Sequence, residues 1–321
     1  MRGLGLLAAA LLVYGLLGLG LGWSAVTGEL GQLPPWIWPL AALVVSAGYG
    51  LLFARWQLLL KALGQPLPPR PSAAIFVAGL ALIAAPARSG EALRGVWLQR
   101  RHGIPLHIGV AATAAERLLD LASALLVLAW GLGQGQARYA MVLVLVAGAA
   151  LLWLLSHPAG FRRLERWLGR LSLGRRWRGL HRVLWEGVQA MAELRRVLRP
   201  APLALGLALT TAVWLLESAL LQRVLLQLGT MLALQQGMVI RTATSLGGGL
   251  SLLPAGLGTS ELTSVGLTML AGASRSQALA ATVVLRAATL LLPSVVGVIG
   301  LALQPDLRRL RRPQDNAGCG S

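Results

Sequence analysis

Charged residues are scarce in this sequence of 321 residues, at 12% of the chain, whereas soluble globular proteins have about a quarter. Apolar residues make up 56%, and the mean hydropathy is +0.68. Such a chain is neither a water-soluble globule nor a disordered segment, and it lacks the repeats of collagen and of coiled coils. Because long uncharged runs alternate with short arginine-rich ones, the sequence predicts an all-α polytopic membrane protein.

Cysteine is almost absent, since Cys319 in the polar C-terminal segment is the only one. A single cysteine excludes a disulfide framework, a paired-thiol redox motif and a metal site built on cysteine. His102 and His107 are five apart without a third ligand beside them, which is not a zinc spacing. The sequence contains no Walker motif for a nucleotide phosphate and no recognisable pairing of a nucleophile with a base. We therefore expect no metal and no other cofactor, and we do not expect an enzyme.

Acidic residues are also few, because 11 of them stand against 29 basic residues, and the formal net charge is +18. All basic residues except Lys61 are arginine. In a protein with several spans, such an excess normally marks the cytoplasmic face and its contact with anionic lipids. We therefore expect anionic membrane lipids as partners, and no nucleic acid.

Six apolar runs are long enough to cross a bilayer. The first is longer than the apolar region of a cleaved signal peptide, so we expect it to remain as a span. Prolines or glycines at the boundaries of the other runs are typical of helix ends. The six runs are Leu4–Trp23, Trp36–Leu60, His107–Gly131, Arg138–Ser156, Pro202–Leu226 and Gln277–Leu303.

Two further apolar segments, Ser72–Gln99 and Gln236–Ala271, are broken near the middle by proline and glycine. Backbone cannot stay unpaired in hydrocarbon, so a break at that depth has to be buried in protein or face a water-filled cavity. We therefore predict two re-entrant helical hairpins, and two tight spans joined at the far surface are the alternative. The predicted tips contain Pro86, Ser89 and Gly90 in the first hairpin and Pro254, Gly256, Gly258 and Thr259 in the second.

The arginines predict the orientation of the spans. With Met1 inside, the segment His157–Arg199 and the tail 304–321 are cytoplasmic, so both termini lie inside. Arg138 and Arg275 are the two arginines that do not follow this positive-inside pattern. Apolar residues recur at helical spacing between the arginines of His157–Arg199. This pattern predicts amphipathic helices in the headgroup layer in preference to a solvated linker.

The chain is predicted to form one membrane domain with two similar parts. The order span, broken hairpin, charged span occurs over 36–131 and again over 202–303. Glu91 and Glu261 follow the two breaks, each two residues after a hydroxyl residue (Thr259 in the second copy) that we expect to cap the next helix. Since the first copy begins outside and the second inside, the sequence predicts an inverted repeat, as in many secondary transporters.

Several charged residues fall within predicted spans or hairpins, where a charge is costly and normally marks a pathway. Arginine is a bidentate donor to phosphate, and the predicted sites for a lipid phosphate are Arg88, Arg94, Arg117 and Arg286. The predicted charge partners or proton carriers are Glu91, Glu116, Asp120, Glu217, Arg241 and Glu261. Similar spacing in the two copies pairs Glu91 with Arg117 and Glu261 with Arg286. Ion pairs that only fix the packing of helices are the alternative.

These motifs resemble the membrane domain of lysylphosphatidylglycerol synthases, which also occurs alone in proteins described as flippase-like. The resemblance extends over nearly the whole chain and is carried by Pro86–Arg94, Glu116–Asp120, Leu253–Glu261 and Arg286. In two-domain members this domain is taken to move aminoacylated phosphatidylglycerol across the membrane, while a separate domain synthesises that lipid. Because the sequence ends at Ser321, soon after the last span, the resemblance implies lipid translocation or lipid binding without aminoacyl transfer.

We therefore expect a flippase-like protein of the cytoplasmic (inner) membrane of a prokaryote that translocates an anionic phospholipid or a polyprenyl-phosphate-linked lipid. A non-transporting scaffold that presents such a lipid to a partner enzyme is the alternative. The resemblance implies a glycosyltransferase or another lipid-modifying enzyme as that partner, since stand-alone relatives often accompany glycosyltransferases. An intramembrane enzyme is the least favoured of the three.

Overall fold

The computed structural model describes residues 23–83, 93–133, 139, 141–143, 146, 148, 166, 178–251, 253 and 255–308. Every regular element in this part of the chain is a helix, as the composition predicted. The first half contains α2 (Trp23–Gln32), α3 (Ile37–Ala62), α4 (Pro69–Leu80), α5 (Leu93–His102) and α6 (Leu106–Gly131). The second contains α9 (Arg178–Val197), α10 (Pro200–Gln227), α11 (Leu234–Leu250), α12 (Thr259–Leu270), α13 (Arg275–Arg286), the π-helical turn η3 (Ala287–Leu291), α14 (Leu292–Ala302) and α15 (Pro305–Arg308).

Three helices of the described residues are long and apolar enough to cross a membrane. They are α3, α10 and the continuous helix α13–η3–α14, and they correspond to three of the predicted spans. The predicted span His107–Gly131 forms α6, which is as long as α3 but carries Glu116, Arg117 and Asp120 near its middle. These helices therefore support the class of multi-pass membrane proteins.

Several predictions concern residues outside the described part of the chain. These are the span Leu4–Trp23 except its last residue, most of the span Arg138–Ser156, the first predicted tip with Pro86, Arg88, Ser89, Gly90 and Glu91, the proline Pro254, and the tail beyond Arg308.

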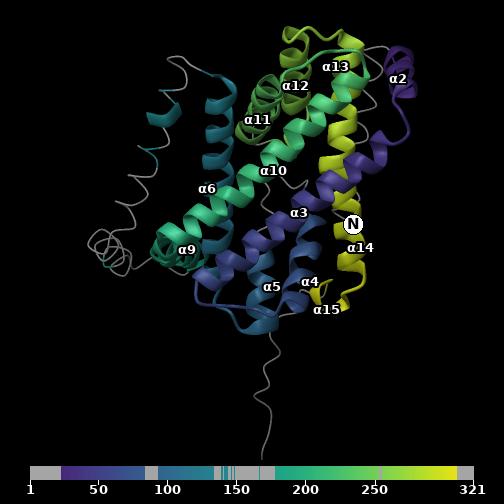
Figure 1. Ribbon diagram of the computed structural model, residues 1–321. Coiled ribbons are helices and arrows are strands. Elements are labelled where there is room, and N and C mark those ends of the chain that lie inside the picture. Colours follow the sequence, from purple (N-terminus) through teal and green to yellow (C-terminus); the bar gives the residue numbers. More distant parts are fainter. Residues whose placement is uncertain are drawn as a thin grey trace, which may run out of the picture.

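The long helices α3 and α10 pack against each other and run in opposite directions (Figure 1). The pair α4 and α5 lies at one end of the molecule, beside the end of α3, and the pair α11 and α12 lies at the other end, beside the end of α10 (Figure 1). Helix α6 packs on both α10 and α11, and α14 packs on α4. Each helical pair therefore contacts a long helix of the other half.

The two halves also share the geometry of their helix ends. Gly64 after α3 and Gly229 after α10 both have positive φ, of 78° and 85°. In each case the amide that follows the glycine donates to a carbonyl five residues earlier, Gln65 to Leu60 and Thr230 to Leu225, both at 2.9 Å. This is the hydrogen bond of a helix closed by a left-handed glycine. The order long helix, helical pair, long helix thus occurs twice with the same turns.

Two apolar cores lie at the two ends of α3. One surrounds Trp56, Leu59 and Leu60 and includes residues of α4, α5, α6 and α9. The other surrounds Ile37 and Ala41 and includes residues of α10 and α13. The part of α3 between them lines a cavity, so each end of the molecule has its own packed core and the polar site lies between the two.

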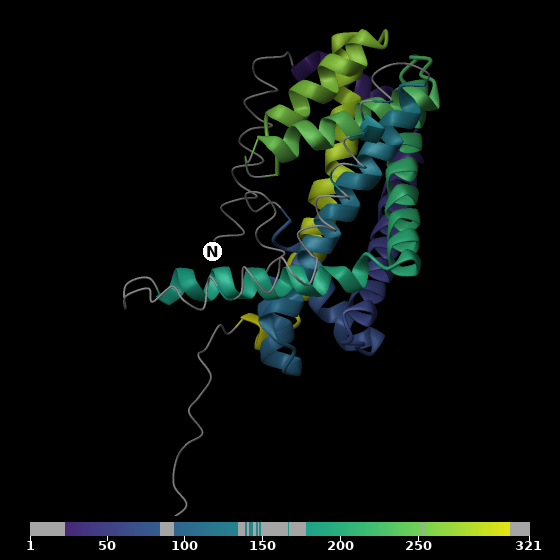
Figure 2. The ribbon, with the colours of Figure 1, turned by 90° about the vertical axis from the view of Figure 1, so that its left-hand side faces the viewer.

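Helix α9 runs nearly perpendicular to the long helices (Figure 2). Its apolar stripe packs partly on the protein, because Val188 and Leu194 are buried, while Leu184 is 41% exposed. Arg196 donates to the carbonyl of Leu63 at 3.1 Å and so ties α9 to the end of α3. The predicted amphipathic helix is present here and, in contrast to a helix lying only in the headgroup layer, it also belongs to the core.

Candidate functional site

A cavity of about 390 Å³ lies between the two halves, with walls from α3, α4, α5, α6, α10, α11, α12, α13 and η3. Its size is that of pockets that hold a small ligand. The charged residues that line it are Arg55, Arg94, Arg117, Arg241, Arg286, Glu116, Asp120 and Glu217. Each of these charged residues takes part in an ion pair, in one cluster and two separate pairs.

The cluster in the first half is centred on Glu116, which is 1% exposed. Its carboxylate lies 2.9 Å from Nη2 of Arg94 and 3.6 Å from Nη2 of Arg55. Arg55 also donates to Asp120 and, at 2.9 Å, to the hydroxyl of Thr210 on α10. The buried charges of α3, α5 and α6 thus compensate one another within the first half, and the hydrogen bond to Thr210 joins the cluster to α10 of the second half.

Arg94 is held from several sides. Its guanidinium lies 4.9 Å from the ring of Trp56 and 5.4 Å from the ring of Phe76, which are cation–π distances. Its aliphatic part crosses Gly79 on α4, where a Cβ atom would lie 2.8 Å from Cδ of Arg94. Glycine at position 79 therefore makes room for this side chain.

Arg117 lines the cavity with a side chain that is 35% exposed and lies 3.2 Å from Asp120. The sequence predicted Glu91 as its partner, but Glu91 lies outside the described residues, and the acid beside Arg117 here is Asp120. The two residues are one helical turn apart on α6, which places them on the same face. Asp120 thus lies between Arg55 and Arg117.

The second half contains the predicted pair of Glu261 with Arg286. Nε of Arg286 lies 2.7 Å from Oε1 of Glu261, and Nη2 of Arg286 donates to the carbonyl of Ala255 at 2.9 Å. Oε2 of Glu261 accepts the amide of Gly258 at 2.7 Å. Arg286 and Glu261 together hold the turn before α12.

The residue that caps α12 differs from the prediction. The cap is Gly258, with φ of 87°, and Thr259 is the first residue of the helix. The hydroxyl of Thr259 donates to the carbonyl of Gly256 at 3.1 Å and does not accept an amide of the first turn. The carboxylate of Glu261 closes this helix end, so the prediction that Thr259 caps it was wrong.

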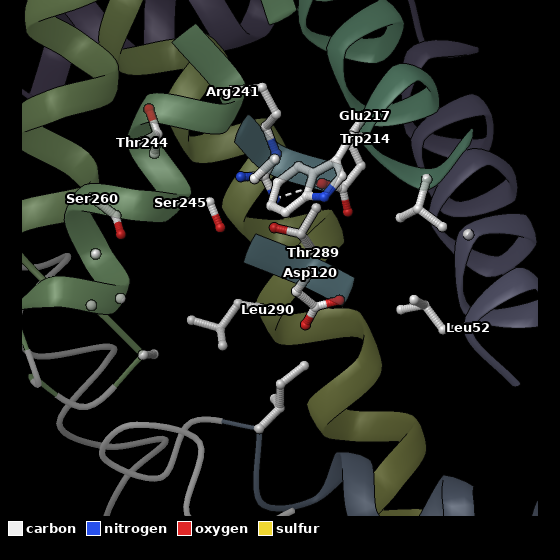
Figure 3. Close-up of a pocket in the computed structure, with 18 of the residues that line it drawn as sticks. Leu52, Asp120, Trp214, Glu217, Arg241, Thr244, Ser245, Ser260, Thr289 and Leu290 are labelled. Carbon is white, nitrogen blue, oxygen red and sulfur yellow. Dashed lines mark ion pairs between the residues drawn. The ribbon is translucent and has the colours of Figure 1, made fainter. Parts of the chain in front are cut away.

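Glu217 on α10 and Arg241 on α11 form an ion pair of 2.6 Å. The guanidinium of Arg241 lies 5.3 Å from the ring of Trp214 (Figure 3). The sequence predicted both charged residues as site residues and missed the tryptophan.

Arg55 was missed as well, although it contacts both Glu116 and Asp120 in the cluster. It lies within the predicted span Trp36–Leu60, six residues before Lys61, where it is easily taken for an arginine of the membrane surface. The signal was present, since it is the one charged residue inside that apolar run.

Among the described residues in and beside the cavity, five arginines face four carboxylates, Glu116, Asp120, Glu217 and Glu261. The described site is therefore more positive than negative, and an anion complements it better than a cation does.

Long apolar helices in two similar halves and a cavity of buried ion pairs between them define a multi-pass helical membrane protein with an internal polar site. The chain matches, over residues 4–297, the family described as lysylphosphatidylglycerol synthase TM region, and it belongs to that family. It is also similar to a UPF0104 membrane protein of Methanothermobacter thermautotrophicus, with 27% identity over 327 residues that cover 92% of this chain and 91% of the relative. The family resemblance predicted from the sequence is thereby confirmed.

Proposed function

We propose that this protein of a prokaryotic cytoplasmic membrane binds the phosphate of an anionic lipid in the cavity between its halves and carries the headgroup across the bilayer. The lipid is a phospholipid or a polyprenyl-phosphate-linked lipid. The observation that supports this most is the excess of arginine in a cavity that both halves line. Phosphate accepts paired hydrogen bonds from guanidinium groups, and a buried site strengthens them.

The proposed topology is an inverted repeat with both termini in the cytoplasm. Its support is the antiparallel course of α3 and α10 and the position of α4–α5 and α11–α12 at opposite ends (Figure 1). In this topology the two helical pairs are re-entrant hairpins that enter from opposite sides. Transporters built in this way bind their substrate near the middle of the membrane, at the interface of the repeats.

Arg117 and Arg286 are the proposed phosphate ligands. They stand the same number of residues after Gly103 and Gly272, the left-handed glycines that end α5 and α12. Arg55 and Arg94 share Glu116, and they are 2% and 4% exposed. We therefore assign Arg55 and Arg94 to positioning, and Arg117 and Arg286 to the ligand.

Transbilayer movement of a fluorescent anionic phospholipid in proteoliposomes tests this proposal. Arg117→Ala is expected to lose movement while the folded fraction stays high, because Arg117 is partly exposed and the phosphate loses a bidentate donor. Arg286→Ala is expected to lose movement as well, and its rate is compared per folded protein because the change also removes the ion pair of buried Glu261. Arg223→Ala is the matched control, since Arg223 is exposed and lies 5.5 Å from the ring of Trp36, away from the cavity. It should leave the rate unchanged.

The second candidate is the scaffold that presents a lipid to a partner enzyme. The exposed arginines Arg195, Arg196 and Arg199 near the end of α9 favour it, because they offer a basic surface to an acidic partner. If well-folded Arg117→Ala and Arg286→Ala variants moved lipid at the wild-type rate, this result would contradict the transport site and favour the scaffold. Neither candidate includes a chemical step.

A further inference from the structure

We infer that Asp120 competes with the ligand for Arg117, as a carboxylate that a phosphate displaces from this arginine and that takes its place again when the phosphate leaves. This inference rests on the proposed function, because it concerns release from the phosphate site. It makes Asp120 a positioning residue that acts through Arg117 and sets how readily this arginine releases its ligand.

The carboxylate of Asp120 is shared between two arginines. Its Oδ1 accepts a hydrogen bond from Nη1 of Arg55, and its Oδ2 lies 3.2 Å from Nη1 of Arg117. The side chain of Arg55 is 2% exposed, whereas that of Arg117 is 35% exposed. A ligand in the cavity therefore has better access to Arg117 than to Arg55.

Asp120 can leave Arg117 and remain paired. A carboxylate and a phosphate both accept hydrogen bonds from a guanidinium group, so one can replace the other. The contact joins residues three apart on one helix and is partly exposed, and such ion pairs are weak. Asp120 keeps its hydrogen bond to Arg55, which also donates to Thr210 at 2.9 Å. Displacement by a phosphate thus strands no buried charge.

The corresponding position of the second half holds a hydroxyl in place of a carboxylate. Asp120 stands three residues after Arg117, and Thr289 stands three residues after Arg286. Both Asp120 and Thr289 line the cavity (Figure 3). The hydroxyl of Thr289 donates to the carbonyl of Leu285 at 2.8 Å and carries no charge. Exchange of one anion for another at this position is therefore a feature of the first half.

The acid that pairs with Arg286 is fixed in place. One oxygen of Glu261 lies 2.7 Å from Nε of Arg286, and the other accepts the amide of Gly258 at 2.7 Å. The side chain of Glu261 is 5% exposed, so it cannot leave Arg286 without opening the turn before α12. A phosphate thus adds to Arg286 beside Glu261, whereas at Arg117 it replaces Asp120.

The first test measures binding of phosphatidic acid to the full-length protein in nanodiscs by native mass spectrometry. Asp120→Asn should bind about three- to tenfold more tightly than the wild type, because the competing charge is gone while the side chain keeps its size. Asp120→Glu, which restores a carboxylate, should return the affinity toward that of the wild type. Asp306→Asn, exposed on α15 and outside the cavity lining, is the matched control for the loss of one acid and should leave the affinity unchanged.

Inorganic phosphate, added as a competitor in the same series, distinguishes a lipid headgroup from free phosphate. The lipid should bind more tightly than inorganic phosphate in every variant, because its acyl chains stay in the bilayer while its phosphate is bound.

The second test places the competing charge in the other half. Thr289→Asp puts a carboxylate three residues after Arg286, and its affinity for phosphatidic acid should lie about three- to tenfold below that of Thr289→Asn. The two variants have side chains of the same size, so the comparison isolates the charge. Both leave the Glu116 cluster intact and keep the inference testable should Asp120→Asn fail to fold.

The third test separates release from stability. In proteoliposomes, Asp120→Asn should move fluorescent phosphatidic acid with a lower half-saturating concentration and a lower maximal rate, because transport requires binding that is weak enough for the ligand to leave. A purely structural role of Asp120 predicts weaker binding together with lower stability.

A well-folded Asp120→Asn variant that binds phosphatidic acid no more tightly than the wild type would overturn the inference. Equal affinities of Thr289→Asp and Thr289→Asn would overturn it as well. The proposed function fails in a different way, when phosphatidic acid binds equally to the wild type, to Arg117→Ala and to Arg286→Ala.

Discussion

Glu116 is the acid on which the first-half cluster depends. It is nearly fully buried between Arg55 and Arg94, two guanidinium groups from helices on either side of it. A buried ion pair contributes little net stability against an apolar replacement, but the loss of one partner strands the other. The residue is therefore expected to matter more for folding than for recognition.

Glu116→Gln tests this role. The variant should lower the free energy of unfolding by about 3–5 kcal/mol, because Arg55 and Arg94 lose a shared carboxylate in a buried site. Glu193→Gln, in the half-exposed pair with Arg196, is the control and should change the free energy by about 1 kcal/mol or less. Thermal unfolding in detergent compares the stability of the two variants. An equal effect of the two substitutions would show that the cluster does not stabilise the fold more than an exposed ion pair does.

The sequence could place some of these residues but not all. Glu116 and Asp120 are four apart in a long apolar run, so a shared helical face inside the membrane was predictable. That Arg55 supplies the partner was not, because the contact joins residues 65 apart and depends on how α3 packs against α6. Trp214 was missed for the same reason, since periodicity does not reveal which face of a largely apolar helix meets a cavity.

At the scale of elements, the helical pairs are positioned by close backbone contacts. Helix α5 approaches α6 at Gly95 and Gly109, and a Cβ on Gly109 would lie 2.3 Å from the Cα of Gly95. Helix α14 approaches α4 in the same way, because a Cβ on Gly297 would lie 2.0 Å from the amide nitrogen of Ala81. Small residues at such contacts are typical of helix packing in membranes. Length and hydropathy predicted α3, α10 and α13–η3–α14 from the sequence, whereas these contacts required the structure.

Gly109→Ala is expected to push α5 away from α6 and with it Arg94 away from Glu116. The predicted result is a loss of about 1–3 kcal/mol in stability, the usual cost of overpacking, together with weaker binding of phosphatidic acid. Gly266→Ala on α12 is the control, since nothing lies within 4 Å of the Cβ that it adds. Thermal unfolding and lipid binding of the two variants are compared, and equal stability would show that the α5–α6 contact tolerates a methyl group.

At the scale of the whole molecule, the two packed cores lie at opposite ends and the ion pairs lie between them. Core packing resists deformation, whereas a polar cavity can exchange partners and water. We therefore propose that the two packed ends of the molecule move relative to each other around the cavity. Arg117 and Arg286, at corresponding positions of the two halves, bind the phosphate during this movement. This requires that the helical pairs face opposite sides of the membrane.

Single cysteines in a Cys319→Ser background test that requirement. Gln99 on α5 is exposed at one end, and Met231, between α10 and α11, is 82% exposed at the other. With an impermeant thiol reagent in sealed vesicles, Gln99→Cys should react only from the cytoplasmic side and Met231→Cys only from the outer side, because α3 and α10 run in opposite directions. Leu270→Cys, which is 85% exposed at the end of α12, is the internal control and should react from the same side as Met231→Cys. If Gln99→Cys and Met231→Cys both reacted from the same side of the membrane, this result would contradict the inverted repeat. The alternating movement proposed for the lipid would then have no structural basis.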